Sequence, residues 1–337
     1  MNHTLGVYTA ILHDRPLPEA LDVIAGLGLN AAEINAGGFL PPVHIPQIDD
    51  IVASETAAQD YLDVFEEKGI RLAGLNVNGN PLHPNPVIGR QQADDLRRAI
   101  LAAAALGQKR VVTMSGLPGG EPGATRPNWI VNAWNSGALD VLDYQWAVAV
   151  DFWKEIAQLA QEHDVKVAIE MHPQNLVFNP PTLLRLIEQV GTDYVGAEMD
   201  PSHLFWQMMD PIAAIDYLGD RVFHAAAKDV RINENARIYG VLDERFRRLG
   251  PEENRLNLGG DEWANEWPKD SAWDFVALGQ GHDTQFWTEF LRALYRVDPD
   301  MACHIEHEDT AFGPIEGLQV AAEVLLAAER NLQVPAG

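Results

Sequence analysis

Short apolar runs of the kind that form strands alternate along the chain with longer amphipathic segments. The first four runs are LGVYTA (5–10), AAEINA (31–36), RLAGLNVN (71–78) and RVVTMSG (110–116). The other four are KVAIEM (166–171), YVGAEMD (194–200), VFHAAAKD (222–229) and MACHIEHED (301–309). Apolar residues recur at helical spacing between the runs, most clearly over 18–28, 91–107, 144–164 and 315–330. The pattern therefore predicts eight strands that alternate with helices.

Strict alternation of strand and helix indicates parallel strands joined by helical crossovers, and eight repeats indicate a closed α/β barrel, the (β/α)₈ or TIM barrel. The alternative is an open doubly wound sheet, which more often carries a glycine-rich phosphate loop after its first strand. Residues 8–16, YTAILHDRP, contain no such loop. No linker rich in glycine, proline and serine divides the chain, so residues 1–337 are predicted to form a single domain.

Residues 230–283 carry no clear pattern of strands and helices. They are rich in charge and in tryptophan, with Trp263, Trp267 and Trp273. We interpret them as a long insertion after the seventh strand, because loops at that end of a barrel form the active-site face and long loops tend to be functional. The alternative is a surface excursion with a local aromatic cluster.

Amino-acid composition and net charge limit the kinds of molecule that the protein is expected to bind. Of the 337 residues, 47% are apolar, which is enough for a substantial core, while 24 basic and 49 acidic side chains give a net charge of −25. Such a field repels nucleic acids and anionic membranes, so neither is an expected partner. The N-terminal MNHTLGVYTAILHD lacks the basic start and apolar core of a signal peptide, and no stretch reaches the roughly 20 apolar residues of a membrane span. We expect a soluble, cytoplasmic protein.

Cys303 is the single cysteine of the sequence, which excludes an internal disulfide and any multi-cysteine zinc or iron–sulfur site. It is expected to be a buried strand residue. Any metal must therefore be held by oxygen and imidazole ligands.

Acidic and imidazole side chains gather where the last four predicted strands end. Because the carboxyl ends of barrel strands converge on one pocket, these residues are expected to meet whatever their separation in sequence. Residues two apart on a strand share a face, as Glu170 and His172 do. The full set is Glu170, His172, Asp200, His203, His224, Lys228, His304, Glu306 and Glu308.

Several of these residues also have an ordinary interpretation. Asp200 before Pro201 is typical of a helix N-terminus, and His224 in an apolar strand is typical of a hydrogen-bonded core histidine. Glu170 and Glu306 lie inside β runs, where a buried carboxylate needs a partner or a cation. Carboxylates and a neutral imidazole from four successive strands favour a divalent ion, Mn²⁺, Mg²⁺ or Co²⁺, with Zn²⁺ as a further candidate.

The chain resembles the xylose-isomerase-like superfamily of TIM-barrel sugar isomerases and epimerases. The motifs that carry the resemblance are GNPLHPNP (79–86), IEMHP (169–173), MDPSHLFWQ (199–207), FHAAAKDVR (223–231) and IEHED (305–309). The resemblance implies a divalent metal, commonly manganese, held by Glu170, Asp200, His224 and Glu306. It also implies that His203, three residues after the aspartate, contacts substrate oxygen.

The chain departs from the family pattern at three positions. Related sequences often carry His-x-His before the Lys-Asp pair, whereas this chain reads His224-Ala225-Ala226. If the family's ligand is the second histidine, the site lacks its imidazole; we prefer His224 because it is the one histidine of that strand and imidazole is a common ligand for such metals. Glu198 and Met208 stand where asparagine and glycine are expected, which predicts a more acidic and tighter pocket.

The metal would polarise a sugar oxygen, acidify the adjacent C–H bond and stabilise the enediolate that forms. The candidate bases are Glu170, Glu306 and His172, and the family's epimerases use the two glutamates on opposite faces of the sugar. Return of the proton gives isomerisation or epimerisation of a ketose or an oxidised 3-keto sugar. Expulsion of a β substituent gives a lyase instead. A superfamily branch that resembles C-glycoside deglycosidase catalytic subunits acts in this way on 3-oxo-glycosides, and IEMHP (169–173) fits it.

Two other function classes remain open. Apurinic-site DNA endonucleases share this barrel but need further metal histidines and a basic DNA face, which a net charge of −25 argues against. A non-catalytic sugar-binding barrel would tolerate the loss of Glu170 or Glu306. The expected partner is a small sugar or glycoside. The tryptophan-rich segment 230–283 could also stack on an aglycone or pack on another chain, so we expect a homo-oligomer or a complex with a small partner subunit.

Four residues are weaker candidates for substrate binding. Asn80 and His83, in the turn after the third predicted strand, can contact sugar hydroxyls or can be structural. Lys228 and Arg231 can bind a phosphate or an enolate oxygen, or can form a salt bridge with Asp229 or another nearby acid.

Overall fold

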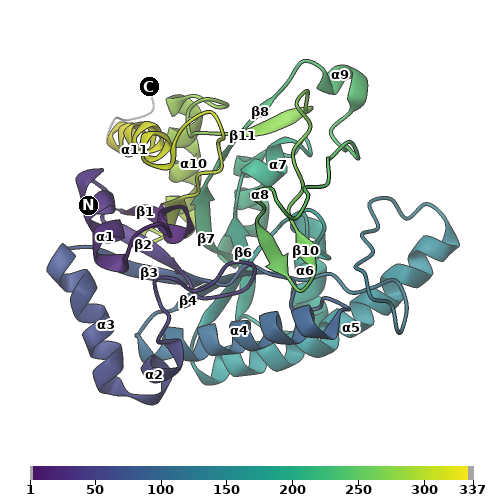
Figure 1. The fold of residues 1–337 in the computed structure, drawn as a ribbon, viewed down its shortest axis with the longest axis horizontal. Helices are drawn as coiled ribbons and strands as arrows, with labels where there is room; N and C mark the ends of the chain where they lie inside the picture. The colour runs from purple at the N-terminus through teal and green to yellow at the C-terminus, as the bar shows by residue number, and fades with distance from the viewer. Residues whose placement is uncertain (1–2, 333–337) are drawn as a thin grey trace.

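Eight parallel strands close into a barrel, which confirms the predicted fold. The structure is a computed structural model and describes residues 3–332 (Figure 1). Each barrel strand pairs with the next one along the chain, and the last pairs with the first. The strands are β1 (Thr4–Tyr8), β2 (Ala31–Asn35), β3 (Arg71–Asn76), β4 (Arg110–Met114), β5 (Lys166–Glu170), β6 (Val195–Met199), β7 (Val222–Ala227) and β12 (Ala302–Ile305).

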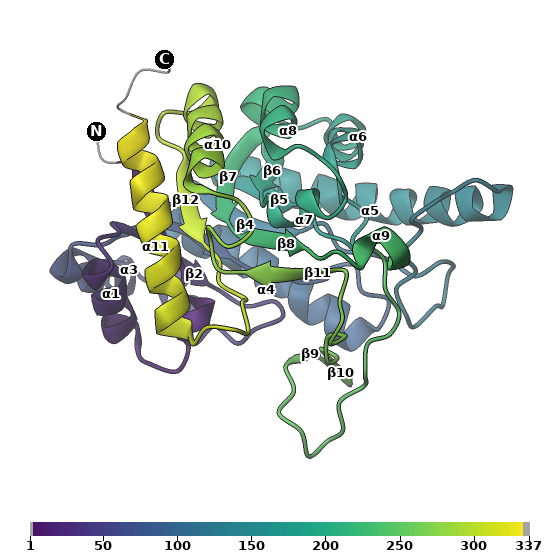
Figure 2. The ribbon, with the colours of Figure 1, turned by 90° about the horizontal axis from the view of Figure 1, so that it is seen from above.

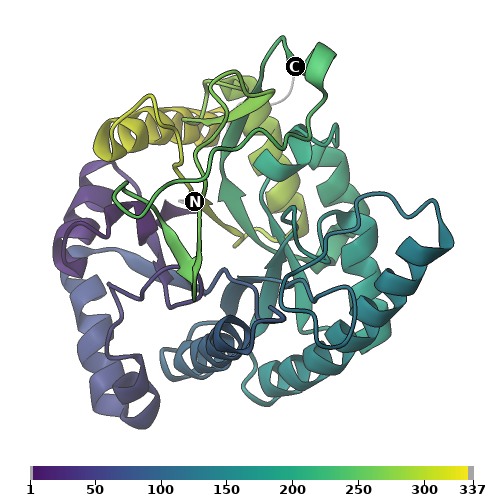
Figure 3. The same ribbon diagram turned by 45° about the vertical axis from the view of Figure 1, so that its right-hand side comes forward.

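Helices connect the strands and surround the barrel (Figure 3). None of the helices within residues 3–332 is long and apolar enough to cross a membrane. Two 3₁₀ turns, η1 (Thr9–Leu12) and η2 (Gly219–Arg221), lie between the other elements. The α-helices are α1 (Leu17–Gly26), α2 (Ile48–Ala53), α3 (Glu55–Lys68), α4 (Pro86–Ala105), α5 (Ser136–Glu162), α6 (Pro180–Val190), α7 (Ser202–Phe205), α8 (Pro211–Leu218), α9 (Ala236–Tyr239), α10 (Thr284–Val297) and α11 (Pro314–Asn331).

Local sequence signals set the ends of α6, the helix before β6. The Asn179 side chain accepts the Thr182 N–H at 3.0 Å, and Thr182 Oγ1 accepts the Asn179 N–H at 3.2 Å. Pro180 occupies the first helical turn, where a backbone N–H would have no helical partner. Gly191 ends the helix at a φ of 74°, in the left-handed region that favours glycine. These signals define where the chain turns back into β6.

The apolar core fills the space between the strands and the helices. Trp153 from α5 and Trp287 and Phe290 from α10 are fully buried in it. Trp153 donates its Nε1–H to the Ser115 carbonyl, 3.0 Å away just past β4, so its polar atom is satisfied although the ring is buried. This packing holds the strands in place from outside.

The segment 230–283 contains short strands, and it lies partly over the barrel. β8 (Asp229–Ile232) pairs antiparallel with β11 (Trp273–Val276), and β9 (Asn257–Gly259) pairs with β10 (Glu262–Trp263). Figure 2 shows the segment extending outward from β8 and β11 beyond the helical layer. Its base is anchored by Asp229, whose Oδ2 accepts the N–H groups of Gly279, Gly281 and His282 at 3.0 Å each.

The last barrel strand is shorter than the predicted run 301–309. β12 ends at Ile305, so Glu306 and Glu308 lie in the loop that follows. The Glu306 N–H still donates to the Ala227 carbonyl at 3.2 Å, which keeps this residue next to β7. The Glu306 side chain is buried, whereas that of Glu308 is 51% exposed.

We expect Gly196→Ala in β6 to destabilise the barrel. A Cβ there would lie 2.4 Å from the Arg221 carbonyl oxygen and 2.5 Å from a Phe223 ring carbon, so β6 and β7 would have to move apart. Overpacking of this kind costs about 1–3 kcal/mol of unfolding free energy, measured by chemical denaturation. The control is Gly26→Ala at the end of α1, where a Cβ meets no atom within 4 Å. Equal effects of the two substitutions would contradict the prediction.

Candidate active site

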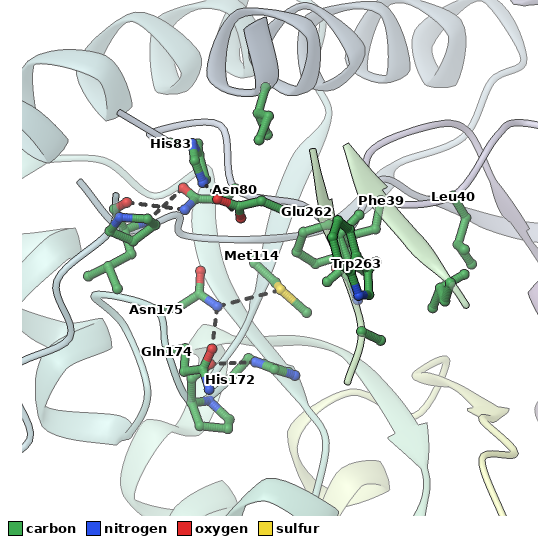
Figure 4. A pocket seen from close by; sticks show the side chains of 18 of the residues that line it. Phe39, Leu40, Asn80, His83, Met114, His172, Gln174, Asn175, Glu262 and Trp263 are labelled. Carbon is green, nitrogen blue, oxygen red and sulfur yellow. Dashed lines mark hydrogen bonds and ion pairs between the residues drawn. The ribbon is translucent and has the colours of Figure 1, made fainter. Parts of the chain in front are cut away.

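A cavity of about 1060 Å³ lies at the carboxyl ends of the barrel strands. One wall comes from the segment 230–283, including Glu262 and Trp263 of β10. Figure 4 shows Trp263 beside Phe39 on one side of the cavity and His172 on another. The barrel contributes residues at or just past seven strand ends: Tyr8, Asn35, Asn78, Met114, Glu170, Lys228 and Glu306.

The barrel register aligns three polar side chains on adjacent strands. The Cα atom of Glu198 on β6 pairs with Glu170 on β5 and with His224 on β7. Laterally paired residues of neighbouring strands point to the same face, and all three side chains are buried. Asp200 follows β6 by one residue, which brings its carboxylate closer to the open end of the barrel.

A row of charged contacts crosses the cavity from β5 to β12. His203 Nε2 lies 3.2 Å from Glu170 Oε1 and 3.5 Å from Asp200 Oδ2. Lys228 Nζ lies 3.9 Å from Asp200 Oδ2 and 3.3 Å from Glu306 Oε2. The structure thus brings together five predicted site residues from the ends of four strands. We call Glu170, Asp200, His203, Lys228 and Glu306 the rim cluster.

The two glutamates of the rim cluster differ in ionisation. Burial opposes ionisation of Glu170, but the neighbouring imidazoles and Lys228 outweigh it and lower its pKa to about 2. Burial raises the pKa of Glu306 well above its usual range, because Lys228 offsets only part of the repulsion from the other carboxylates. Glu306 therefore gives up its proton less readily than Glu170 does.

The basic groups of the rim cluster also have defined charges. Burial works against the ammonium of Lys228, but Glu308, Glu306 and the other acids raise its pKa well above the usual value. Its Nζ lies 2.8 Å from Glu308 Oε1 and 4.6 Å from the Phe275 ring centroid. Burial lowers the pKa of His203 to about 3, so this imidazole is neutral.

A second polar cluster lies deeper in the barrel. His224 Nε2 lies 2.8 Å from Glu33 Oε2 and 2.9 Å from His304 Nδ1, and His304 Nδ1 lies 2.9 Å from the same Glu33 oxygen. Asn76 donates to the other Glu33 oxygen at 2.8 Å. All four side chains are buried. We call Glu33, His224 and His304, with the adjacent Glu198, the deep cluster.

The structure separates His224 from the other predicted metal ligands. Within residues 3–332, three groups have ligand atoms that all lie within 4.8 Å of one another, and the set of Glu170, Asp200, His224 and Glu306 is not among them. The three groups are Glu33 with His224 and His304, Glu33 with Glu198 and Glu306, and Glu170 with His172 and His203. The imidazole nearest to Glu170 and Asp200 is instead that of His203.

Glu198 is the member of the deep cluster that lies near Glu306 of the rim cluster. Its side chain is 0% exposed, and neither carboxylate oxygen has a hydrogen-bond partner within the described part of the chain. Burial and repulsion from Glu306, Glu170 and Glu33 raise its pKa well above the usual value. A buried carboxyl group in this position takes up a proton or a cation.

Three predicted substrate-contacting or catalytic residues line the cavity. The His172 ring lies 4.2 Å from the His203 ring, and His172 Nδ1 lies 2.6 Å from its neighbour's carbonyl oxygen. Asn80 is held by the protein, because its Nδ2 donates to the Leu117 carbonyl at 3.1 Å. His83 Nε2 lies 3.3 Å from a Glu262 oxygen, which ties β10 to the barrel. The roles of these residues stay predictions.

Arg231 and Met208 do not line the cavity. Arg231 lies on β8, is exposed, and forms the alternative salt bridge, with Asp274 at 3.4 Å. Met208 has a φ of 63°, which explains the family's glycine, and its side chain is 93% exposed. The expectation that Met208 tightens the pocket is therefore wrong, because the side chain points to solvent. Cys303 is buried in β12, as predicted.

Sequence reasoning missed Tyr8, Glu33 and Asn78. Asn78 Nδ2 donates to Glu170 Oε2 at 2.5 Å, and Tyr8 Oη donates to Asn35 Oδ1 at 3.2 Å. Burial and the neighbouring carboxylates raise the pKa of Tyr8 well above its usual value. Glu33 carried a usable signal, since it is a charged residue inside the predicted strand run 31–36, like Glu170 in 166–171. The polar residues at the ends of the first three strands do not belong to sequence motifs like those at the ends of the last four strands, so no pattern indicated that they line the cavity.

Residues 21–328 match the family described as xylose isomerase-like TIM barrel. The chain belongs to this family. An uncharacterized protein of Bacillus subtilis (strain 168), YfiH, is 33% identical over 326 residues, which are 95% of this chain and 97% of YfiH.

Solved structures share the xylose isomerase-like barrel at low sequence identity. The 3-keto-D-glucoside 4-epimerase YcjR from E. coli, in its apo form, has a TM-score of 0.59 at 13% identity and covers 98% of this chain and 100% of its own. A xylose isomerase-like TIM barrel protein from Mycobacterium smegmatis in complex with magnesium has a TM-score of 0.58 at 14% identity. The match covers 95% of this chain and 92% of that protein's chain. At such identities the likeness shows the fold alone.

We expect the ionisation of Asp200 to destabilise the protein as the pH rises. The measurement uses protein that has been treated with a chelator to remove metal. Burial raises the Asp200 pKa to about 7, with Lys228 opposing and Glu170 adding to the shift. An acid whose pKa is higher in the folded than in the unfolded chain binds more protons when folded, so its ionisation costs stability from about pH 4 up to about pH 7. The gain in Tm of Asp200→Asn over wild type should grow across that window. Parallel Tm curves would contradict this assignment.

Proposed function

We propose that the protein is a divalent-metal-dependent enzyme that removes the proton beside a carbonyl group of a sugar and returns it elsewhere. The substrate class is a ketose or an oxidised 3-keto sugar, and the outcome is isomerisation or epimerisation through an enediolate. The observation that carries the proposal is the meeting of Glu170 and Glu306 in one cavity, where an imidazole lies 3.2 Å from Glu170 and the Lys228 ammonium lies 3.3 Å from Glu306. Two carboxyl groups held in different surroundings of one pocket can act as an acid and base pair.

Glu170 is the base in this proposal. Its carboxylate is ionised, and Asn78 and His203 on its two oxygens hold its orientation. It takes the proton from the carbon beside the carbonyl, and the electron pair moves to the carbonyl oxygen. Glu306 then supplies a proton to the opposite face, which gives epimerisation. His172, in the same cavity, is the alternative base.

The cavity also offers groups that would bind the sugar and the developing charge. Lys228 is a buried ammonium in the rim cluster and would stabilise an enolate oxygen. Tyr8 is an uncharged donor near the same carboxylates. Phe39 and Trp263 lie beside each other at the cavity (Figure 4), and their flat apolar faces would stack on a sugar ring.

The rim cluster offers carboxylates to a divalent metal, and its side chains would have to move inward to bind one, because the set of Glu170, Asp200 and Glu306 is not among the groups of described residues whose ligand atoms lie within 4.8 Å of one another. Asp200 Oδ2 and Glu306 Oε1 are buried and have no hydrogen-bond partner among residues 3–332, so both oxygens remain available to a cation. Glu170, Asp200 and Glu306 would hold the ion, with His203 as the nearest imidazole. A set of ligands made mainly of carboxylates suits Mn²⁺, with Mg²⁺, Co²⁺ or Zn²⁺ as alternatives. The structure of the M. smegmatis protein in complex with magnesium also supports a divalent ion. When bound, the ion would polarise the sugar carbonyl and acidify the neighbouring C–H bond.

We expect Glu170→Gln to remove this activity. Wild-type protein with Mn²⁺ in deuterated water should incorporate deuterium beside the carbonyl of a free ketose or a 3-keto sugar, as read by mass spectrometry. Loss of the base should slow exchange about 10²–10⁴-fold. The control, Glu188→Gln on the exposed face of α6, should exchange at the wild-type rate. Absence of metal-dependent exchange with every ketose and every 3-keto sugar would refute the proposed function.

A second candidate function is β-elimination from 3-oxo-glycosides, and an aromatic side pocket favours it. This pocket of about 460 Å³ shares Trp129 and His172 with the main cavity. Its size and apolar character suit an aromatic aglycone joined to a sugar in the main cavity. Its further aromatic walls are Trp206, Phe246, Trp267, Trp273 and Phe275.

The elimination would start from the same proton abstraction. The base removes the C2 proton beside the C3 carbonyl, a double bond forms between C1 and C2, and the bond from C1 to the aglycone breaks. The aglycone leaves with a proton, which Glu306, an acid of the rim cluster with a raised pKa, would supply. His172 lies at the border of the two pockets, where the breaking bond would be.

We expect Trp267→Ala to separate the two candidate functions. If the side pocket holds an aglycone, KM for an aryl 3-oxo-glucoside should rise about tenfold, since aromatic stacking contributes about 0.5–1.5 kcal/mol beyond burial. KM for the methyl 3-oxo-glucoside should not change. The control is Trp134→Ala, a tryptophan that is 85% exposed outside both pockets. Equal KM values for aryl substrate in wild type and Trp267→Ala would count against the elimination.

A further inference from the structure

We infer that the deep cluster of Glu33, Glu198, His224 and His304 is a second divalent-cation site, below the rim cluster. Its ligand set mixes carboxylates with two imidazoles, which suits a borderline ion such as Zn²⁺ or Co²⁺. The site is separate from the proposed reaction, because none of the four residues is needed there as a base or an acid.

Three ligand atoms of the deep cluster already face one point. Glu33 Oε2, His224 Nε2 and His304 Nδ1 form a triangle with sides of 2.8, 2.9 and 2.9 Å. Hydrogen bonds between the two imidazoles and Glu33 account for two of these short distances. The third distance joins the ring nitrogens of His224 and His304, which face each other. A tetrahedral ion with bonds of about 2.0–2.1 Å holds its ligand atoms about 3.3 Å apart, so a small outward movement accommodates it.

Glu198 supplies an independent indication of a cation. Both of its oxygens are buried and have no hydrogen-bond partner within residues 3–332. One of them lies within 4.8 Å of ligand oxygens of Glu33 and Glu306, which places it near the rim cluster. Its Cα atom pairs with that of His224 on the neighbouring strand. A cation bound by Glu33 and the two histidines would therefore lie within reach of Glu198.

The barrel register places the ligands of the deep cluster on neighbouring strands. His304 of β12 pairs with Ala226 of β7, a residue with a small side chain. On the other side of β7, Glu198 of β6 pairs with His224. The three strands therefore bring a carboxylate and two imidazoles into the interior of the barrel.

The barrel leaves space for the His304 ring, and the charge balance favours a second ion. A Cβ on Gly6 of β1 would lie 2.1 Å from the Ala31 carbonyl oxygen of β2 and 2.7 Å from His304 Cδ2, so glycine allows the close approach of both β2 and the imidazole. The buried carboxylates outnumber the one ammonium, that of Lys228, that contacts them. Two divalent ions would neutralise the remaining negative charge. The carboxylates of both clusters are Glu33, Glu170, Glu198, Asp200 and Glu306.

The test is the zinc content of the intact protein after saturation with Zn²⁺ and gel filtration, measured by inductively coupled plasma mass spectrometry. Wild type should hold two equivalents per chain. Glu198→Gln and His304→Gln should each lose one, and Asp200→Asn should lose the other. The control, His307→Gln, replaces a buried histidine outside both clusters and should hold two. Wild-type zinc content in both deep-cluster variants would overturn the inference.

A second measurement covers the case in which the deep-cluster variants do not fold. X-ray absorption of zinc in Asp200→Asn should report two imidazole ligands per ion, since the remaining ion would be bound by His224 and His304. No bound zinc in that variant, or zinc without imidazole scattering, would overturn the inference. These readouts do not depend on turnover, so failure of the deuterium exchange would refute the proposed reaction and leave the deep site to be judged by its own metal content.

Discussion

The cost of burying five carboxylates at one end of the barrel constrains the whole site. Like charges in a poorly solvated space cannot all stay ionised, so the set divides according to its neighbours. Glu33 and Glu170 are paired with imidazoles, which hold their pKa values low. Glu198 and Glu306 lack sufficient compensation, and their pKa values are raised. The same imbalance underlies both the proposed acid and base pair and the inferred binding of cations.

The closed barrel decides which of these groups meet. Eight parallel strands deliver their carboxyl ends to one opening, and the lateral register sets the depth of each side chain. Glu198 and His224 lie side by side on β6 and β7, whereas Asp200 and Lys228 reach the rim because they follow those strands. At the end of β6, Glu198 of the deep cluster and Asp200 of the rim cluster are therefore only two residues apart.

The segment 230–283 completes the site on the side where the barrel is open. Its β10 places Glu262 against His83 and brings Trp263 to the cavity, while β11 brings Phe275 over Lys228. These contacts place aromatic side chains beside the charged groups of the rim cluster. Part of the cavity wall thus comes from a segment that contributes no residue to either cluster of acids and imidazoles.

The sequence by itself determined the barrel, because the spacing of apolar residues in strands and helices is a local property that the chain displays directly. It also determined that Glu170, Asp200, His203, Lys228 and Glu306 come together, because their motifs lie at the ends of four consecutive barrel strands. Only the tertiary structure decided that His224 contacts Glu33 and His304. Glu33 and His304 are 271 residues apart, and their contact depends on how β1 closes the barrel between β2 and β12.

The pairing of β8 with β11 likewise places Arg231 away from the cavity and beside Asp274. No local sequence pattern indicated this pairing. The physical reason is the same in both cases. Lateral register between strands is set by closure and packing of the whole barrel and of its insertion, whereas apolar periodicity reports only the conformation of each segment.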